Sequence, residues 1–257
     1  MSAEIGYDWK GGGEEWSEPW GNSSAQWFGS IFPRIQEWLP ANTILEIAPG
    51  FGRWTHYLLE HCTHIVLVDL RPDCIDACRQ RFAAKSNLSY YKNDGRSLAM
   101  VADDSIDFVF SFDSLVHAPR VALEDYLTQL GRKLKRDGVG FFHHSNLGSY
   151  AGSMDRRLPK RARKLLTKIG LSESDHSRVP DMTAGIFRDL CAERGLKCIR
   201  QELVNWRGRR VLDCISTFVR AGSKRESPLR VSRNPDFMRE AELIRRRAQN
   251  YHSINEQ

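Results

Sequence analysis

Short apolar runs alternate with amphipathic segments through the middle of the chain. The apolar runs, rich in β-branched and aromatic residues, cover 43–48, 64–70, 88–93, 106–112 and 138–145. Segments with the apolar spacing of a helix lie between them, at 53–61, 72–83 and 122–134. Each run is apolar enough to be buried on both faces, which is typical of parallel strands between helix layers. The alternation predicts βαβ units and a doubly wound α/β fold.

A different pattern follows the fifth strand. An irregular stretch covers 146–181, and a helix at 182–195 then resumes the rhythm. Two further apolar runs flank Arg207 and Gly208 as a long antiparallel hairpin would. The sequence therefore predicts a Rossmann-like sheet of seven strands, mostly parallel, with an antiparallel terminal strand. A nicotinamide-binding Rossmann domain normally continues with parallel units, so the hairpin disfavours an NAD-dependent oxidoreductase.

These patterns divide the chain into three parts. Residues 1–42 form an N-terminal arm rich in glycine and aromatic residues, and 43–221 form the α/β domain, with 146–181 as a basic insertion on its substrate side. Residues 222–257 are interpreted as a linker followed by a charged helix. A chain of 257 residues with 41% hydrophobic content suffices for one core with such appendages.

Hydropathy and cysteine content indicate where in the cell the protein is located. The chain has no apolar run of about 18 residues and no signal-peptide pattern, so we expect a cytoplasmic protein. Six cysteines occur inside apolar patterns without a C-x-x-C pair, which indicates reduced core residues and no metal site.

The net charge of +6 is concentrated in two basic stretches, 156–168 and 245–247. Such stretches are either solvated helix faces or patches that contact an anionic membrane or a phosphorylated substrate, and both interpretations remain open.

A tight turn follows the first strand in "ILEIAPGFGRWTHYL", residues 44–58. Ligands of doubly wound sheets bind beyond the carboxyl ends of the strands, where this turn lies. Gly50 and Gly52 permit positive φ and a close approach of the backbone to a ligand. Glu46, near the strand end, can meet an ammonium group. The G-x-G-x-x-G pattern of dinucleotide-binding proteins is matched only in part, because Thr55 stands at its last position.

The stretch "LEIAPGFGRW" resembles motif I, E-x-G-x-G-x-G, of the class I S-adenosylmethionine-dependent methyltransferases. Ala48 stands where that family often has its first glycine. The resemblance implies that Asp69, which closes the second strand beside Leu70, binds the ribose hydroxyls of the cofactor. In "KNDGRSL", it implies that Asp94 accepts from the adenine amino group, with Gly95 and Arg96 beside the ring.

Two later stretches support the resemblance, which covers roughly Leu45 to Ala221. "IDFVFSFDSLVHAP" resembles the motif after the fourth strand, and "LKRDGVGFFHHSN" resembles the turn and fifth strand. The resemblance implies S-adenosylmethionine as the cofactor. Trp20, with Trp16 and Trp27 in the N-terminal arm, is expected either to cap this cofactor or only to pack at the edge of the sheet.

Methyl transfer is an in-line displacement, and a hydroxyl nucleophile also needs a base to take its proton. Histidines His117, His143 and His144 follow or end the fourth and fifth strands. Alternation along a strand places His143 and His144 on opposite faces, so at most one of them faces the site. The predicted catalytic residues are His144, nearer the strand end, and His117, with Asp113 to orient a histidine or ligate a divalent ion.

The acceptor is less constrained. The N-P-P-Y type of sequence, found in enzymes that methylate amino groups of nucleic acid or glutamine, is absent, which favours an oxygen acceptor and no nucleic-acid partner. "DSLVH" and "FFHHSN" are similar to bacterial methyltransferases of glycan assembly, and a natural-product O-methyltransferase fits almost as well. The expected acceptor is a hydroxylated small molecule, sugar or glycan. The alternative is a non-catalytic, methyltransferase-like scaffold that binds nucleic acid or membrane through the basic stretches.

Overall fold

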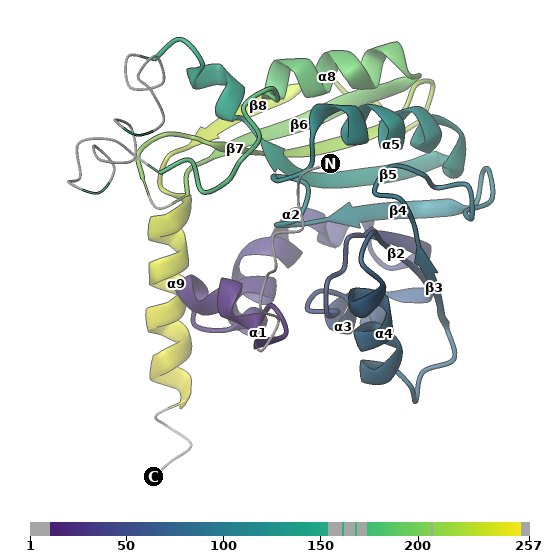
Figure 1. The fold of residues 1–257 in the computed structure, drawn as a ribbon, viewed down its shortest axis with the longest axis horizontal. Coiled ribbons are helices and arrows are strands. Elements are labelled where there is room, and N and C mark those ends of the chain that lie inside the picture. The colour runs from purple at the N-terminus through teal and green to yellow at the C-terminus, as the bar shows by residue number, and fades with distance from the viewer. Residues whose placement is uncertain (1–10, 154–160, 162–167, 169–173, 207, 253–257) are drawn as a thin grey trace. The chain divides into compact units, whose positions relative to one another are not determined.

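The structure is a computed structural model that describes residues 11–153, 161, 168, 174–206 and 208–252 (Figure 1). Most of the basic stretch 156–168 lies outside the described residues, as does Arg207 of the predicted hairpin turn. The chain divides into two compact units, Met1–Asn93 with Arg239–Gln257, and Asp94–Met238. The two units are described one at a time.

The first unit contains three parallel strands in the order β3-β2-β1. The elements in chain order are β1 (Ala41–Ile47), α3 (Thr55–Leu58), η5 (Leu59–His61), β2 (Cys62–Asp69), α4 (Pro72–Arg81) and β3 (Leu88–Lys92). Pro72 occupies the first turn of α4, where its missing N–H is not needed. The alternation predicted two βαβ units in this region, and the structure confirms them.

The N-terminal arm forms a series of short helical turns in the same unit. They are η2 (Glu14–Trp20), α1 (Ser23–Gln26), the π-helical turn η3 (Trp27–Ile31), α2 (Phe32–Ile35) and η4 (Gln36–Trp38). The Asn22 side chain caps α1 by accepting the Ala25 N–H at 2.8 Å.

The C-terminal helix α9 (Phe237–His252) runs alongside the arm (Figure 1). Arg34 of α2 pairs with Glu240 at 3.6 Å. A Cβ added to Gly29 would lie 2.9 Å from Ile244, which shows how closely η3 approaches α9. The charged helix predicted at the C-terminus therefore supports the arm.

The described residues of the second unit form five strands in the order β4-β5-β7-β6-β8. Its elements are β4 (Ile106–Ser111), α5 (Arg120–Lys133), β5 (Leu134–Ser145), η6 (Leu147–Tyr150), α8 (Ala184–Glu193), β6 (Leu196–Val204), β7 (Asp213–Arg220) and β8 (Arg230–Asn234). β4 and β5 are parallel, whereas β7 lies antiparallel between β5 and β6. This arrangement confirms the predicted antiparallel strand.

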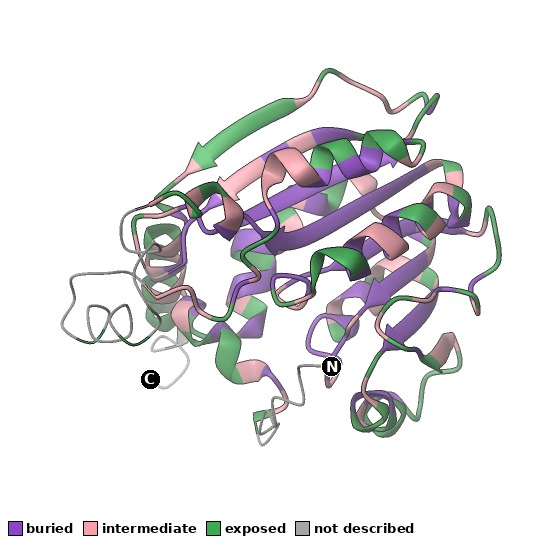
Figure 2. Cartoon of the chain, turned by 45° about the horizontal axis from the view of Figure 1, so that its top comes forward, coloured by how far each residue is buried: buried purple, intermediate pink, exposed green. Residues whose placement is uncertain are grey.

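The described residues contain eight strands, whereas the sequence predicts seven. The additional strand, β8, lies within the stretch interpreted as a linker and pairs in parallel with β6. Most of β8 is exposed, including Val231 at 58% (Figure 2). An exposed edge strand needs no apolar alternation, and "RVSRN" has none, so the periodicity gave no signal for it.

No described helix combines the length and apolar character needed to cross a bilayer. All six cysteines are free thiols, and all but Cys62 are buried.

Gly140, inside β5, allows a test of how closely β5 and β7 pack. Gly140 pairs with Phe218 of β7, and a Cβ added to Gly140 would lie 2.1 Å from the Phe218 ring. We expect Gly140→Ala to lower the free energy of unfolding by about 1–3 kcal/mol, because the ring has to leave its position. Urea unfolding followed by circular dichroism measures the change.

The matched control is Gly185→Ala in α8, where the nearest atom to an added Cβ is 3.7 Å away. Alanine favours a helix by up to about 1 kcal/mol over glycine, so this variant should be unchanged or more stable. Equal stability of the two variants would contradict the close contact between Gly140 and Phe218.

Candidate functional site

The loop after β1 bends through three residues with positive φ. Ala48 has φ 57°, Gly50 has φ 58° and Gly52 has φ 80°. Glycine adopts these angles without strain, whereas an alanine in this region costs roughly 1 kcal/mol. A Cβ on Gly52 would lie 2.6 Å from the Phe82 ring, so the loop is also closely packed. The tight turn predicted from the glycine spacing is confirmed.

Asp69 at the end of β2 accepts two backbone N–H groups, from Gly50 at 3.1 Å and from Arg71 at 2.9 Å. Burial raises the pKa of its carboxyl to about 6, although the two backbone hydrogen bonds oppose the rise. Each carboxylate oxygen keeps a second lone pair, so Asp69 can also accept from the hydroxyls of a ligand. Leu70, half exposed beside it, offers apolar surface at the same strand end. These residues fit the ribose of a nucleoside.

Glu46 is buried near the end of β1 and accepts the Thr55 hydroxyl at 2.6 Å. Burial raises the pKa of this carboxyl to about 8, against the opposing effects of the Thr55 hydrogen bond and the charge of Arg53. Glu46 therefore carries a proton at neutral pH and ties β1 to the first turn of α3. Its role toward a ligand ammonium stays a prediction.

The N-terminal arm packs directly on this loop and on α3. The Ser17 hydroxyl accepts from the buried Arg53 at 3.1 Å, and the Ser23 and Tyr57 hydroxyls are 2.9 Å apart. The Trp27 ring stacks on Tyr57 with centroids 5.2 Å apart. Trp20 is fully buried. The arm thus covers the loop, while a role of Trp20 over the cofactor stays a prediction.

Asp94 begins the second unit and organises the turn after β3. Its Oδ1 accepts the N–H groups of Ser97 at 2.7 Å and Arg96 at 2.9 Å, and these bonds lower the pKa of the carboxyl. Gly95 has φ 79°, and Arg96 pairs with Asp125. Asp94 and Arg96 are exposed. Their roles toward adenine stay predictions.

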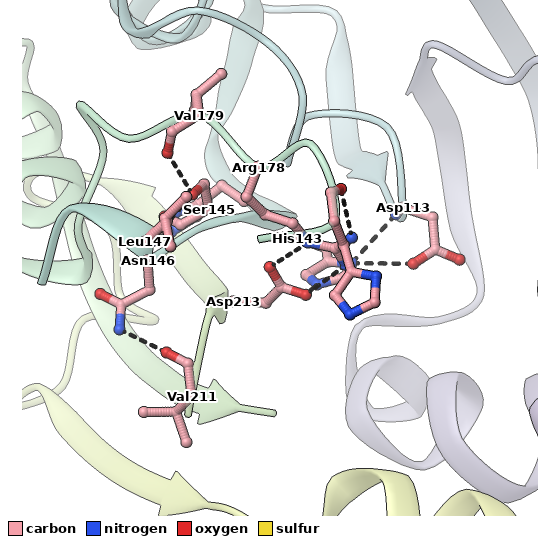
Figure 3. Close-up of polar contacts among 11 residues, drawn as sticks. Asp113, His143, Ser145, Asn146, Leu147, Arg178, Val179, Val211 and Asp213 are labelled. Carbon is pink, nitrogen blue, oxygen red and sulfur yellow. Dashed lines mark hydrogen bonds and ion pairs between the residues drawn. The ribbon is translucent and has the colours of Figure 1, made fainter. Parts of the chain in front are cut away.

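His143 lies between two carboxylates at the carboxyl end of β5 (Figure 3). Its Nδ1 is 3.2 Å from Asp113 Oδ1, and its Nε2 is 3.3 Å from Asp213 Oδ2. Arg178 binds Asp213 through two nitrogens, at 2.9 and 2.7 Å. Burial lowers the pKa of His143, but the two carboxylates outweigh it and raise the pKa above its usual value. Protein groups thus contact both ring nitrogens.

The Asp113 N–H also lies 3.2 Å from His143 Nδ1. That bond needs an unprotonated Nδ1, whereas the ion pair with the Asp113 carboxylate needs a protonated one. The raised pKa favours the imidazolium, and in a neutral ring Nδ1 would accept from the Asp113 amide while Nε2–H faces Asp213. Asp213 and Arg178 are absent from the sequence prediction, because no local pattern marks residues that meet only through the fold.

His144, the histidine preferred on sequence grounds, lies in the core. Its Nε2 is 2.8 Å from the Ser216 hydroxyl, its Nδ1 is 2.9 Å from the Ser145 carbonyl, and its ring stacks on Phe187 at 4.1 Å. Burial lowers the pKa of His144 to about 4, so the ring is neutral at physiological pH. The side chain is fully buried, and the geometry gives it a structural position.

His117 follows β4 and is exposed. Its Nδ1 donates to the Ser177 carbonyl at 3.0 Å, which leaves the lone pair on Nε2. Partial burial of the ring lowers its pKa, with a further lowering from the charge of Arg178. His117 is therefore neutral near pH 7 and has one nitrogen prepared to accept a proton.

Among the residues that the structure describes, no three or more His, Cys, Asp or Glu side chains are grouped to hold a metal ion. The predicted alternative role of Asp113 as a metal ligand stays a prediction.

Comparison with known proteins agrees with this geometry. Residues 44–138, from within β1 to the first part of β5, match the family model described as a methyltransferase domain. Ribosomal RNA small subunit methyltransferase A of Coxiella burnetii is 34% identical over 53 residues, which are 21% of this chain and 20% of that protein. The chain thus spans about a fifth of the length of the curated relatives it matches.

Two solved structures share the fold over most of the chain. One is an S-adenosylmethionine-dependent methyltransferase from Mesorhizobium loti, with 19% identity, a TM-score of 0.55 and coverage of 76% of this chain and 98% of that chain. The other is the N-methyltransferase NodS from Bradyrhizobium japonicum, with 14% identity, a TM-score of 0.53 and coverage of 76% and 94%. At these identities the likeness concerns the fold alone. The matched domain and the strand order within each unit identify a methyltransferase domain with the class I fold, and this family implies S-adenosylmethionine as the cofactor.

Proposed function

We propose that the protein transfers a methyl group from S-adenosylmethionine to a hydroxyl group of a small molecule, sugar or glycan. The observation that carries the proposal is His117, which is exposed, follows β4 and is held in one tautomer by the Ser177 carbonyl. A hydroxyl group is a poor nucleophile until its proton is being removed, whereas a neutral amine needs little help. A histidine prepared as a base therefore favours an oxygen acceptor.

When bound, the cofactor supplies an electrophilic methyl group on its sulfonium. The glycine loop lets the backbone approach the cofactor closely, and Asp69 accepts from the ribose hydroxyls. His117 Nε2 takes the proton of the acceptor hydroxyl. Asp113, with its side chain 14% exposed, contacts the acceptor while His143 orients its carboxylate from within the core. None of the described features favours the alternative of a non-catalytic scaffold.

The first test concerns Asp69. We expect Asp69→Asn to weaken binding of S-adenosylhomocysteine by about 1.5–3 kcal/mol, because hydrogen bonds to a charged acceptor are lost. In the wild type the affinity should fall as the pH drops through about 6, where the carboxyl takes up a proton and can no longer accept as well. Isothermal titration calorimetry between pH 5 and 8 measures both effects.

The matched control is Asp76→Asn, an exposed aspartate of α4 whose partner is Arg79. It should leave affinity and its pH dependence unchanged. A wild-type affinity independent of pH, together with an unaffected Asp69→Asn variant, would remove Asp69 from the cofactor site.

The second test concerns the base. We expect His117→Gln to lower kcat by about 10²–10⁴ and to leave the affinity for S-adenosylhomocysteine unchanged. In the wild type, the rate should decline at acidic pH below the usual histidine pKa, where His117 becomes protonated, and the variant should lose this decline. Single-turnover rates across pH 5–8 provide the measurement.

His144→Gln serves as the comparison, because His144 is buried and bonded to Ser216. It should lower stability while the kcat of the folded fraction stays close to that of the wild type. The reverse result, with His144 essential for turnover and His117 dispensable, would refute the assignment.

The acceptor is identified by incubating the protein with S-adenosylmethionine labelled in its methyl group and panels of sugars, glycans, nucleotide-sugars and small phenols. Mass spectrometry then locates the label. Label on oxygen supports the proposal, and label on nitrogen alone refutes the oxygen acceptor while leaving the methyltransferase domain in place.

A further inference from the structure

The N-terminal arm buries polar side chains as well as apolar ones. Ser17, Ser23, Gln26 and Ser30 are all buried, at intervals of three to six residues. Segments that only cover a sheet normally bury apolar side chains, because a buried polar group destabilises the fold unless it is hydrogen-bonded. Each of these buried polar groups therefore needs a hydrogen-bond partner.

The three buried serines are satisfied within the arm and its neighbours. Ser17 accepts from Arg53, Ser23 pairs with the Tyr57 hydroxyl, and Ser30 accepts from Arg34. Gln26 differs, because neither its amide nitrogen nor its amide oxygen has a hydrogen-bond partner among the described residues. The side chain is fully buried.

An unpartnered buried amide destabilises a protein by about 1–3 kcal/mol and calls for an explanation in the native fold. The residues around Gln26 in sequence contact the glycine loop and the helix that follows it. Ser23 lies three residues before Gln26, on the same side of α1, and its hydroxyl contacts the Tyr57 hydroxyl. The ring of Trp27, the next residue, stacks on the Trp54 ring with the two centroids 6.2 Å apart. Gln26 therefore belongs to the part of the arm that packs on the loop and on α3.

The chemistry near this loop suits a zwitterion. Arg53 is buried beside Ser17, with its guanidinium 4.3 Å from the centroid of the Trp54 ring, and Glu46 is buried close enough to feel its charge. A cation attracts a carboxylate, and the carbonyl oxygen of a protonated carboxyl group can accept a hydrogen bond from an ammonium. A glutamine amide supplies N–H donors, so it can bind the carboxylate of an amino acid.

We propose that Gln26 is a ligand of the amino-acid end of S-adenosylmethionine, which carries an α-carboxylate and an α-ammonium group. The arm then contributes a binding residue and does not only shield the loop. This inference rests on the proposed cofactor site at the glycine loop.

The experiment compares two ligands that differ only in this end. S-adenosylhomocysteine carries the amino-acid group, whereas 5′-methylthioadenosine has a methyl group in its place. Gln26→Met nearly conserves the side-chain volume. We expect it to lower the affinity for S-adenosylhomocysteine by about tenfold to a hundredfold and the affinity for 5′-methylthioadenosine by less than about twofold. Calorimetric titration gives both constants, and the apo variant should melt at or above the wild-type temperature because a buried polar group has been removed.

Gln36→Met is the matched control, since Gln36 lies in the same arm and is exposed, and it should bind both ligands like the wild type. Gln26→Glu is the second variant, and it keeps an acceptor but places a negative charge near the carboxylate. It should lower the affinity for S-adenosylhomocysteine at least as much as Gln26→Met does.

The outcomes separate this inference from the cofactor site on which it rests. Equal weakening of both ligands, or unchanged binding of S-adenosylhomocysteine by both Gln26 variants, overturns the role of Gln26 and leaves the glycine-loop site intact. If the wild type binds neither ligand, the proposed cofactor site itself is wrong.

Discussion

Two backbone N–H groups converge on the buried carboxylate of Asp69, and the shape of the glycine loop depends on that pairing. Gly50 contributes one of them, so the loop after β1 is fixed to the end of the neighbouring parallel strand. The Ala48 N–H adds a second link, to the Val68 carbonyl at 2.8 Å. Hydrogen bonds to an ionised acceptor are stronger than neutral ones, and here they partly offset the desolvation of the carboxylate. The register of β1 on β2 thereby sets the loop geometry.

A comparable constraint organises the second unit. Arg178 pairs with Asp213, and His143 lies between Asp213 and Asp113, so that the four residues alternate in charge when His143 is protonated. Removing one partner from such a series would leave a buried charge uncompensated, which is strongly destabilising.

The pairing of Arg178 with Asp213 also holds the stretch around Ser177, whose carbonyl selects the tautomer of His117. Two further bonds secure this stretch, from the Val179 N–H to the Val116 carbonyl at 3.2 Å and from the Ser145 hydroxyl to the Val179 carbonyl at 2.7 Å. The chemistry of an exposed histidine thus depends on a buried ion pair.

The sequence contained what was needed for the loop and for the fold apart from β8, because glycine spacing and local periodicity record them. Its preference for His144 over His143 rested only on their order along the strand. Alternation places them on opposite faces, but both faces of a sheet between helix layers are apolar, so nothing local shows which face meets a ligand. Arg178 lies in a stretch without periodicity, and Gln26 ends a helix of four residues, too short to display a face. Their roles depend on contacts between distant segments.

Four features of the first unit are unfavourable for stability when taken singly. Ala48 holds a positive φ, burial raises the pKa of Glu46 and of Asp69, and Gln26 is buried without a partner. Proteins tend to keep such violations of local rules where a ligand binds. A ligand with hydroxyl donors, an ammonium and a carboxylate would satisfy the three polar side chains together, and its preference for the folded state would stabilise the unit. Binding of such a ligand would therefore raise the stability of this unit, which ties its stability to its function.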